Sequence, residues 1–242
     1  KLSITKVNKY NQIMNIMTLY KEIAEHRRCS DIVTNYIHYP IAILLCAIIS
    51  STFITPNMIT LIAVITELLA VWLIYTDLVE YRIIIVILLQ LGWVFDLMDG
   101  MIARYKKLGS CHPTNPSLKG FYWDSVSDHV LRLVVLSFLG IHVSQQYDYG
   151  IYFAIAGISI HAITQVEHIL RDYILKGVKT TLPVKNDNIR IIDQIILLFN
   201  NIYIFYFIFI LINRIDLLFI VLPTIEIILF IKRFFQFSFS KN

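Results

Sequence analysis

The stretch GWVFDLMDGMIARYKKLGSCHPTNPSLKGFYWDSVSDHVLR, residues 92–132, decides how the rest of this chain is interpreted. It carries four aspartates at spacings of three, twenty-five and four residues: Asp96, Asp99, Asp124 and Asp128. Long apolar runs lie on both sides, at residues 83–95 and 130–141. Acidic side chains at the ends of segments hydrophobic enough to span a membrane have an unfavourable insertion free energy, so their placement needs a physical reason.

Composition places the chain among integral membrane proteins. Of its 242 residues, 57% are hydrophobic and only 16% are charged, with a mean hydropathy of +0.67. A soluble domain of this length does not need so much apolar surface. Three scattered cysteines do not make a disulfide framework, and a net charge of +4 gives no reason to expect nucleic acid as a partner. We therefore expect an all-α polytopic membrane protein.

Hydrophobic runs and turn residues divide the chain into two parts. We expect residues 1–54 to form a cytoplasmic or interfacial segment, which ends in an apolar helix at residues 40–53 that lies on the membrane. Thr55 and Pro56 then match the N-cap and first position of a helix. Residues 55–242 would form one domain of six membrane-spanning helices, at residues 57–75, 83–104, 120–143, 149–170, 191–212 and 215–235.

The basic residues predict an orientation for these six helices. Eighteen of the 21 Lys and Arg residues fall in the N-terminal segment, the loops at 104–119 and 171–190, and the C-terminus. With six spans these four regions share one side of the membrane, which the positive-inside rule assigns to the cytoplasm. Both termini and the aspartates would therefore face the cytoplasm.

Helical geometry places the aspartates on facing stripes. At about 100° per residue, Asp96, Asp99, Gly100, Ala103 and Arg104 share a stripe roughly 140° wide. Gly120, Asp124 and Asp128 are spaced four apart and share a face of the next span. Carboxylates at close range do not all stay ionised without a cation, and oxygen ligands favour Mg²⁺, Mn²⁺ or Ca²⁺. Two such ions could clamp a phosphate. The plainer alternative is ordinary interfacial charge solvated by water.

The same residues resemble a known motif. Asp96-x2-Asp99-Gly100-x2-Ala103-Arg104, followed by Gly120-x3-Asp124-x3-Asp128, is similar to the signature of the CDP-alcohol phosphatidyltransferase family. The upstream Thr55 to Thr60 resembles the segment that opens the family's first span, and the six-span layout is similar. The chain departs from the family pattern in one place, because fifteen residues separate Arg104 from Gly120 where the family has about eight.

The resemblance implies an enzyme of phospholipid biosynthesis that transfers a substituted phosphate from a CDP-linked donor to an alcohol, with release of CMP. Two divalent ions, Mg²⁺ or Mn²⁺, would be held by Asp96, Asp99, Asp124 and Asp128, and Asp128 would also act as general base. The residues implied to bind the donor are Pro56, Asn57, Thr60, Gly100, Ala103, Arg104 and Gly120. The resemblance further implies a homodimer.

Other polar residues are candidates for the acceptor site. Arg132 lies one turn after Asp128 and either binds an anionic acceptor or pairs with Asp128. Glu167 and Arg171 are four apart, which favours a structural pair. The alternative is an acceptor pocket at the cytoplasmic end of the fourth span, formed by Arg171 with Lys119, Lys185 and Arg190.

Three functions stay open at this point. The chain length favours transfer of a phosphatidyl group from CDP-diacylglycerol to a soluble alcohol. The second possibility is transfer of a head group from CDP-choline or CDP-ethanolamine to a diglyceride or other acceptor. A more remote alternative is an ion-coupled transporter, although no internal repeat is visible and the acids gather at one membrane side.

Overall fold

The computed structural model describes residues 16–178 and 191–239, apart from residues 29, 116 and 118 and the side chains of residues 121, 168, 171–178, 192 and 236–239. The described part is helical and contains no strand. A short helical run at residues 16–24 comes first. The further elements, in chain order, are η1 (Thr34–His38), α2 (Tyr39–Ile49), α3 (Pro56–Tyr105), η2 (Gly109–Cys111), α4 (Lys119–Gln146), α5 (Gly150–Val178), α6 (Ile191–Leu198), α7 (Ile202–Leu211) and α8 (Ile215–Phe239).

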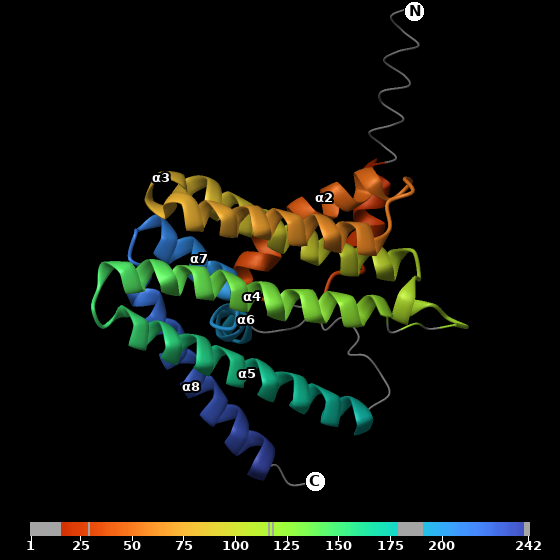
Figure 1. Cartoon of the computed structure of the whole chain (residues 1–242). Coiled ribbons are helices and arrows are strands. Elements are labelled where there is room, and N and C mark those ends of the chain that lie inside the picture. The colour runs from red at the N-terminus through yellow and green to blue at the C-terminus, as the bar shows by residue number, and fades with distance from the viewer. Residues whose placement is uncertain (1–15, 29, 116, 118, 179–190, 240–242) are drawn as a thin grey trace, which may run out of the picture.

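The long helix α3 is a pair of antiparallel legs, as Figure 1 shows. Its backbone leaves helical geometry at Asp77, and the Asp77 carboxylate caps the second leg by accepting a hydrogen bond from Glu80 N at 3.0 Å. Thr60 on the first leg donates a hydrogen bond to Asp99 on the second leg. Glu67 on the first leg likewise lies against Gly92 on the second. These pairs are symmetric about residue 80, which lies between the two spans predicted at residues 57–75 and 83–104.

The start of α3 confirms one prediction from the sequence. Thr55 is the N-cap, its side chain accepts a hydrogen bond from Met58 N at 3.4 Å, and Pro56 occupies the first turn. Proline suits this position because the first amide of a helix has no intrahelical acceptor.

The remaining long helices pack under this hairpin (Figure 1). α4 and α5 form a second antiparallel hairpin, and α8 runs beside α5 in the same direction. His161 Nδ1 on α5 lies 2.5 Å from Glu226 Oε1 on α8. Further along the two helices, Arg233 pairs with Glu167 at 3.4 Å. Glu167 is therefore joined to α8, whereas the predicted partner Arg171 has its side chain outside the described residues.

The N-terminal segment is packed into the body of the molecule. Ile23, Ala42 and Cys46 are buried in one cluster with Met98 and Ile102 of the second α3 leg. The apolar helix predicted at residues 40–53 is observed as α2, which continues directly from the π-helical turn η1. The described residues of the N-terminal segment therefore pack against the second leg of α3.

The fifth predicted helix is wrong as a continuous element. Residues 191–212 form two helices, α6 and α7, which are separated by a turn at residues 199–201. Asn201 begins α7 by accepting a hydrogen bond from Tyr203 N, and its amide donates to Asp31 at 3.0 Å and Thr34 at 3.1 Å. The break occurs because these buried side-chain bonds replace the helical bonds that a continuous helix would make.

Two helical segments of the described chain are long and apolar enough to cross a membrane, residues 56–111 and residues 122–146. The first contains both legs of α3. The six-span layout and its orientation stay predictions.

Candidate active site

The four aspartates converge from two helices. Carboxylate oxygens of Asp96, Asp124 and Asp128 all lie within 4.8 Å of one another. Oδ1 of Asp124 is buried and has no hydrogen-bond partner among the described residues. Three carboxylates at this spacing, one of them with an unsatisfied oxygen, fit the ligand set of a hard divalent cation.

Asp99 lies beside this group and is held by the first leg of α3. It is only 4% exposed, and its Oδ2 accepts a short hydrogen bond from Thr60 Oγ1. The antiparallel pairing of the legs therefore brings Thr60 to the acidic cluster. A side chain that fixes a carboxylate in this way orients it for a metal.

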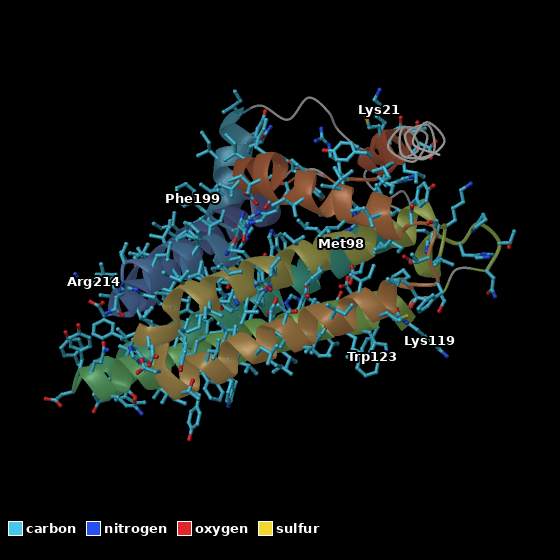
Figure 2. All side chains as sticks on the ribbon, turned by 90° about the horizontal axis from the view of Figure 1, so that it is seen from above. Lys21, Met98, Lys119, Trp123, Phe199 and Arg214 are labelled. Carbon is cyan, nitrogen blue, oxygen red and sulfur yellow. The ribbon has the colours of Figure 1, made fainter. Side chains whose placement is uncertain are left out.

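The aspartates open into a cavity of about 790 Å³. The cavity lies toward the end of the bundle where α3 ends and α4 begins, which Figure 2 shows at Lys119 and Trp123, while Arg214 marks the opposite end. All seven residues predicted to bind the donor line this cavity: Pro56, Asn57, Thr60, Gly100, Ala103, Arg104 and Gly120. Two of the predicted acceptor residues, Lys119 and Arg132, also line it.

The absence of a side chain at Gly100 makes room for the guanidinium of Arg104. A Cβ on Gly100 would lie 3.1 Å from Nη1 of Arg104, so the missing side chain leaves room for the guanidinium to lie along the helix. Nε of Arg104 donates to the carbonyl of His26 at 2.7 Å. Burial and the nearby charge of Arg104 lower the pKa of His26 below its usual value.

Arg132 belongs to a chain of contacts that leads deep into the bundle. Its Nη2 lies 3.3 Å from Oδ2 of Asp128, and its guanidinium lies over the ring of Tyr203, 5.8 Å from the centroid. The Tyr203 hydroxyl donates to Glu67 at 2.8 Å, and Trp93 stacks on the Tyr203 ring. The structure thus shows the pairing alternative for Arg132, in a position that also lines the cavity.

Tyr203 and Glu67 were not predicted from the sequence. Both are buried, at 2% and 3% exposure, and their hydrogen bond joins α7 to the first leg of α3. A glutamate inside an apolar run was a possible signal for Glu67, because such a group needs a partner. Nothing in the sequence identified that partner as a tyrosine 136 residues away.

The N-terminal segment also contributes to the wall of the cavity. Arg28, Ser30 and Tyr39 all come from the N-terminal segment. The sequence predicted only a cytoplasmic or interfacial segment for residues 1–54, and Arg28 was not among the predicted site residues. Its position beside the aspartates follows only from the packing of that segment against α3.

The enlarged loop at residues 105–119 forms another part of the cavity wall. Leu108, Gly109, Ser110, Cys111 and Ser117 line the cavity. Gly109 has a φ of +60°, a left-handed conformation that favours glycine, and its carbonyl accepts a hydrogen bond from Ser117 N at 3.0 Å. This bond closes the loop on itself at the edge of the cavity.

The remaining acceptor candidates cannot be placed in the cavity. Lys185 and Arg190 lie outside the described residues, as does the side chain of Arg171. Their predicted role stays a prediction.

Comparison with known proteins gives two findings. A family model described as ceramide phosphoethanolamine synthase matches residues 27–148, which is half of the chain and includes all four aspartates. A curated ceramide phosphoethanolamine synthase from Drosophila melanogaster is 34% identical over 101 residues, which cover 40% of this chain and 26% of that protein. The match therefore spans about a quarter of the length of that relative. The region that the family model matches contains both helices that carry the acidic cluster.

Proposed function

The chain belongs to the ceramide phosphoethanolamine synthase family, and from this premise we propose that it transfers phosphoethanolamine from a CDP-linked donor to a lipid hydroxyl, with release of CMP. The acceptor that the family name indicates is ceramide. This is the head-group direction of the two transfers that the sequence left open. The family supports it over transfer of a phosphatidyl group from CDP-diacylglycerol.

One observation carries the proposal: aspartates from two helices meet in a cavity that is also lined by every residue the motif assigns to the donor. A cavity of about 790 Å³ is within the usual range for a small-molecule site. A bundle of apolar helices around it also suits an enzyme whose acceptor is a membrane lipid.

Asp96, Asp124 and Asp128 are the residues that would hold divalent metal, with Asp99 oriented beside them by Thr60. When bound, Mg²⁺ or Mn²⁺ would neutralise negative charge on the diphosphate and on the leaving CMP. The unsatisfied Asp124 oxygen is the observation in this chain that favours a bound cation. In this arrangement the protein supplies position and charge, as in other phosphoryl transfers.

Asp128 is the group we assign to proton transfer. The acceptor hydroxyl oxygen forms a bond to the phosphorus of the ethanolamine phosphate, the bond from that phosphorus to the CMP oxygen breaks, and the hydroxyl proton passes to the Asp128 carboxylate. Arg132 contacts one oxygen of Asp128, which holds the carboxylate in place. Tyr203, beneath the guanidinium of Arg132, limits the movement of that arginine.

The test is a donor and acceptor panel with purified protein in lipid vesicles. CDP-ethanolamine, CDP-choline and CDP-diacylglycerol would each be combined with ceramide, diacylglycerol or a soluble alcohol. CMP release and product mass are then measured. We expect ceramide phosphoethanolamine from CDP-ethanolamine with ceramide, and loss of activity with a chelator that added Mn²⁺ or Mg²⁺ reverses.

One variant and a matched control test the assignment of Asp128 as the general base. Asp128→Asn should lower turnover by at least about a hundredfold, because proton transfer typically contributes a factor of 10² to 10⁴. Asp148→Asn is the matched control, because Asp148 is exposed in the turn between α4 and α5 and should leave turnover unchanged. Full turnover in Asp128→Asn would refute the base assignment, and absence of CMP release from all three donors would refute the proposed function.

A further inference from the structure

The segment from His26 to Asp31 is hydrogen-bonded at both ends to the helical bundle. At one end the His26 carbonyl accepts a hydrogen bond from Arg104 on α3 at 2.7 Å. At the other end the Asp31 carboxylate accepts bonds from Thr34 N at 2.8 Å and from the Asn201 amide at 3.0 Å. The described residues between these points are therefore held against the bundle.

Arg28 lies between these two attachments and lines the cavity that contains the aspartates. Its backbone N–H donates to the hydroxyl of Tyr39 at 3.2 Å, which fixes the main chain at the cavity wall. Tyr39 is itself only 3% exposed and belongs to the core beneath the segment. The Arg28 side chain is exposed and has no hydrogen-bond or ion-pair partner among the described residues. Its guanidinium is thus free to bind a ligand in the cavity.

Arg104 presents a second guanidinium on the same wall. Its Nε is bonded to His26, whereas its two terminal nitrogens have no hydrogen-bond partner in the part of the chain that the structure describes. The space at Gly100 lets this group lie close to the helix. Both guanidinium groups line the same cavity as the four aspartates, so they can contact a phosphate that a metal held by those aspartates would bind. Guanidinium groups also match the geometry of phosphate oxygens better than other cations do.

We propose that Arg28 is a phosphate-binding residue of this site, which acts with Arg104 on the diphosphate of a nucleotide donor. The N-terminal segment would then complete the donor site rather than serve only as a membrane anchor. The identification of the phosphate as that of a CDP-linked donor rests on the proposed function. The phosphate contact itself can be tested without turnover.

The experiment compares binding of CDP and of cytidine, with Mn²⁺ present, to the wild type, Arg28→Ala and Arg27→Ala. Arg27 is the matched control because it has the same charge, is exposed, and does not line the cavity. We expect Arg28→Ala to weaken CDP binding by about tenfold or more, since a hydrogen bond to a charged group is worth at least that factor. Cytidine binding should be unchanged, and Arg27→Ala should match the wild type with both ligands.

The possible outcomes separate this inference from the proposed function. Unchanged CDP affinity in Arg28→Ala, or equal weakening in Arg27→Ala, would overturn the inference. A loss in Arg28→Ala confined to binding of anionic lipid vesicles would also overturn it, because it would assign Arg28 to a lipid phosphate. Selective loss of CDP affinity in a protein that releases no CMP would uphold the inference while the proposed function fails. Equal melting temperatures of the three proteins would exclude misfolding as the cause.

Discussion

Removal of a single hydroxyl in Tyr203→Phe should destabilise the protein without dismantling the site. The Tyr203 hydroxyl donates to Glu67 Oε1 at 2.8 Å, and both residues are buried. The second oxygen of Glu67 has no hydrogen-bond partner among the described residues, so the variant would leave both oxygens unsatisfied. An unpaired buried group costs about 1 to 3 kcal/mol, and more if it is charged. For a chain of this size each kcal/mol lowers the melting temperature by roughly 2–4 °C.

The aromatic ring should keep its own contacts in this variant. Phenylalanine retains the stacking on Trp93 and the surface over which Arg132 lies. We therefore expect the melting temperature in detergent to fall by several degrees, with turnover under stabilising conditions changed by less than about threefold, because phenylalanine keeps most of the cation–π contact. Tyr203→Leu removes the ring as well, so that Arg132 and with it Asp128 lose their support. That variant should lose both stability and turnover.

A double-mutant cycle gives the sharpest form of this test. Glu67→Leu removes the other partner, so the combined variant no longer buries an unpaired hydroxyl or carboxyl group at this contact. Its destabilisation should be smaller than the sum of the two single effects by about 1 kcal/mol or more. Tyr152→Phe, on the exposed side of α5, should be neutral. Strict additivity, or a melting temperature of Tyr203→Phe equal to that of the wild type, would refute the reasoning.

Three further predictions concern Gly100 and Thr60, which line the cavity, and His26, which contacts Arg104 of the cavity wall. Gly100→Ala adds a Cβ at 3.1 Å from Arg104 Nη1, which should displace the guanidinium and raise the KM for the donor. Alanine also favours the helix by up to about 1 kcal/mol, so the melting temperature should be unchanged or higher. An unchanged KM would contradict the role of this contact. Thr60→Val removes the hydrogen bond to Asp99 at nearly constant side-chain volume. We expect the Mn²⁺ concentration for half-maximal activity to rise by about tenfold or more. A Mn²⁺ activation curve identical to that of the wild type would contradict this role of Thr60. Because the folded state lowers the pKa of His26, the unfolded chain binds more protons there, so stability falls as the pH drops through 6.5. When the pH is lowered from 7.5 to 5.5, the melting temperature should fall less in His26→Gln than in the wild type. Equal decreases in the two proteins would show that His26 does not cause the pH dependence.

Much of the structure near the motif could be predicted because it depends on local spacing. Residues three and four apart share a helix face, so the sequence alone placed each pair of aspartates on one side of its helix. Thr55 and Pro56 indicated the start of α3, and the gap between the spans predicted at residues 57–75 and 83–104 indicated its reversal. Both signals depend on neighbouring residues, and the structure confirms both.

The sequence by itself therefore determined that this is an apolar helical protein with acidic groups at the end of two helices. Only the tertiary structure decided that Arg28 faces those acids, that Tyr203 satisfies Glu67, and that α6 and α7 break at Asn201. Each of these features joins residues from segments far apart in the chain, through packing that no periodicity encodes. Because a helix repeats every 3.6 residues, the spacing of residue types in the sequence shows which residues share a face. Which helix packs against that face depends on how all the helices fill space together.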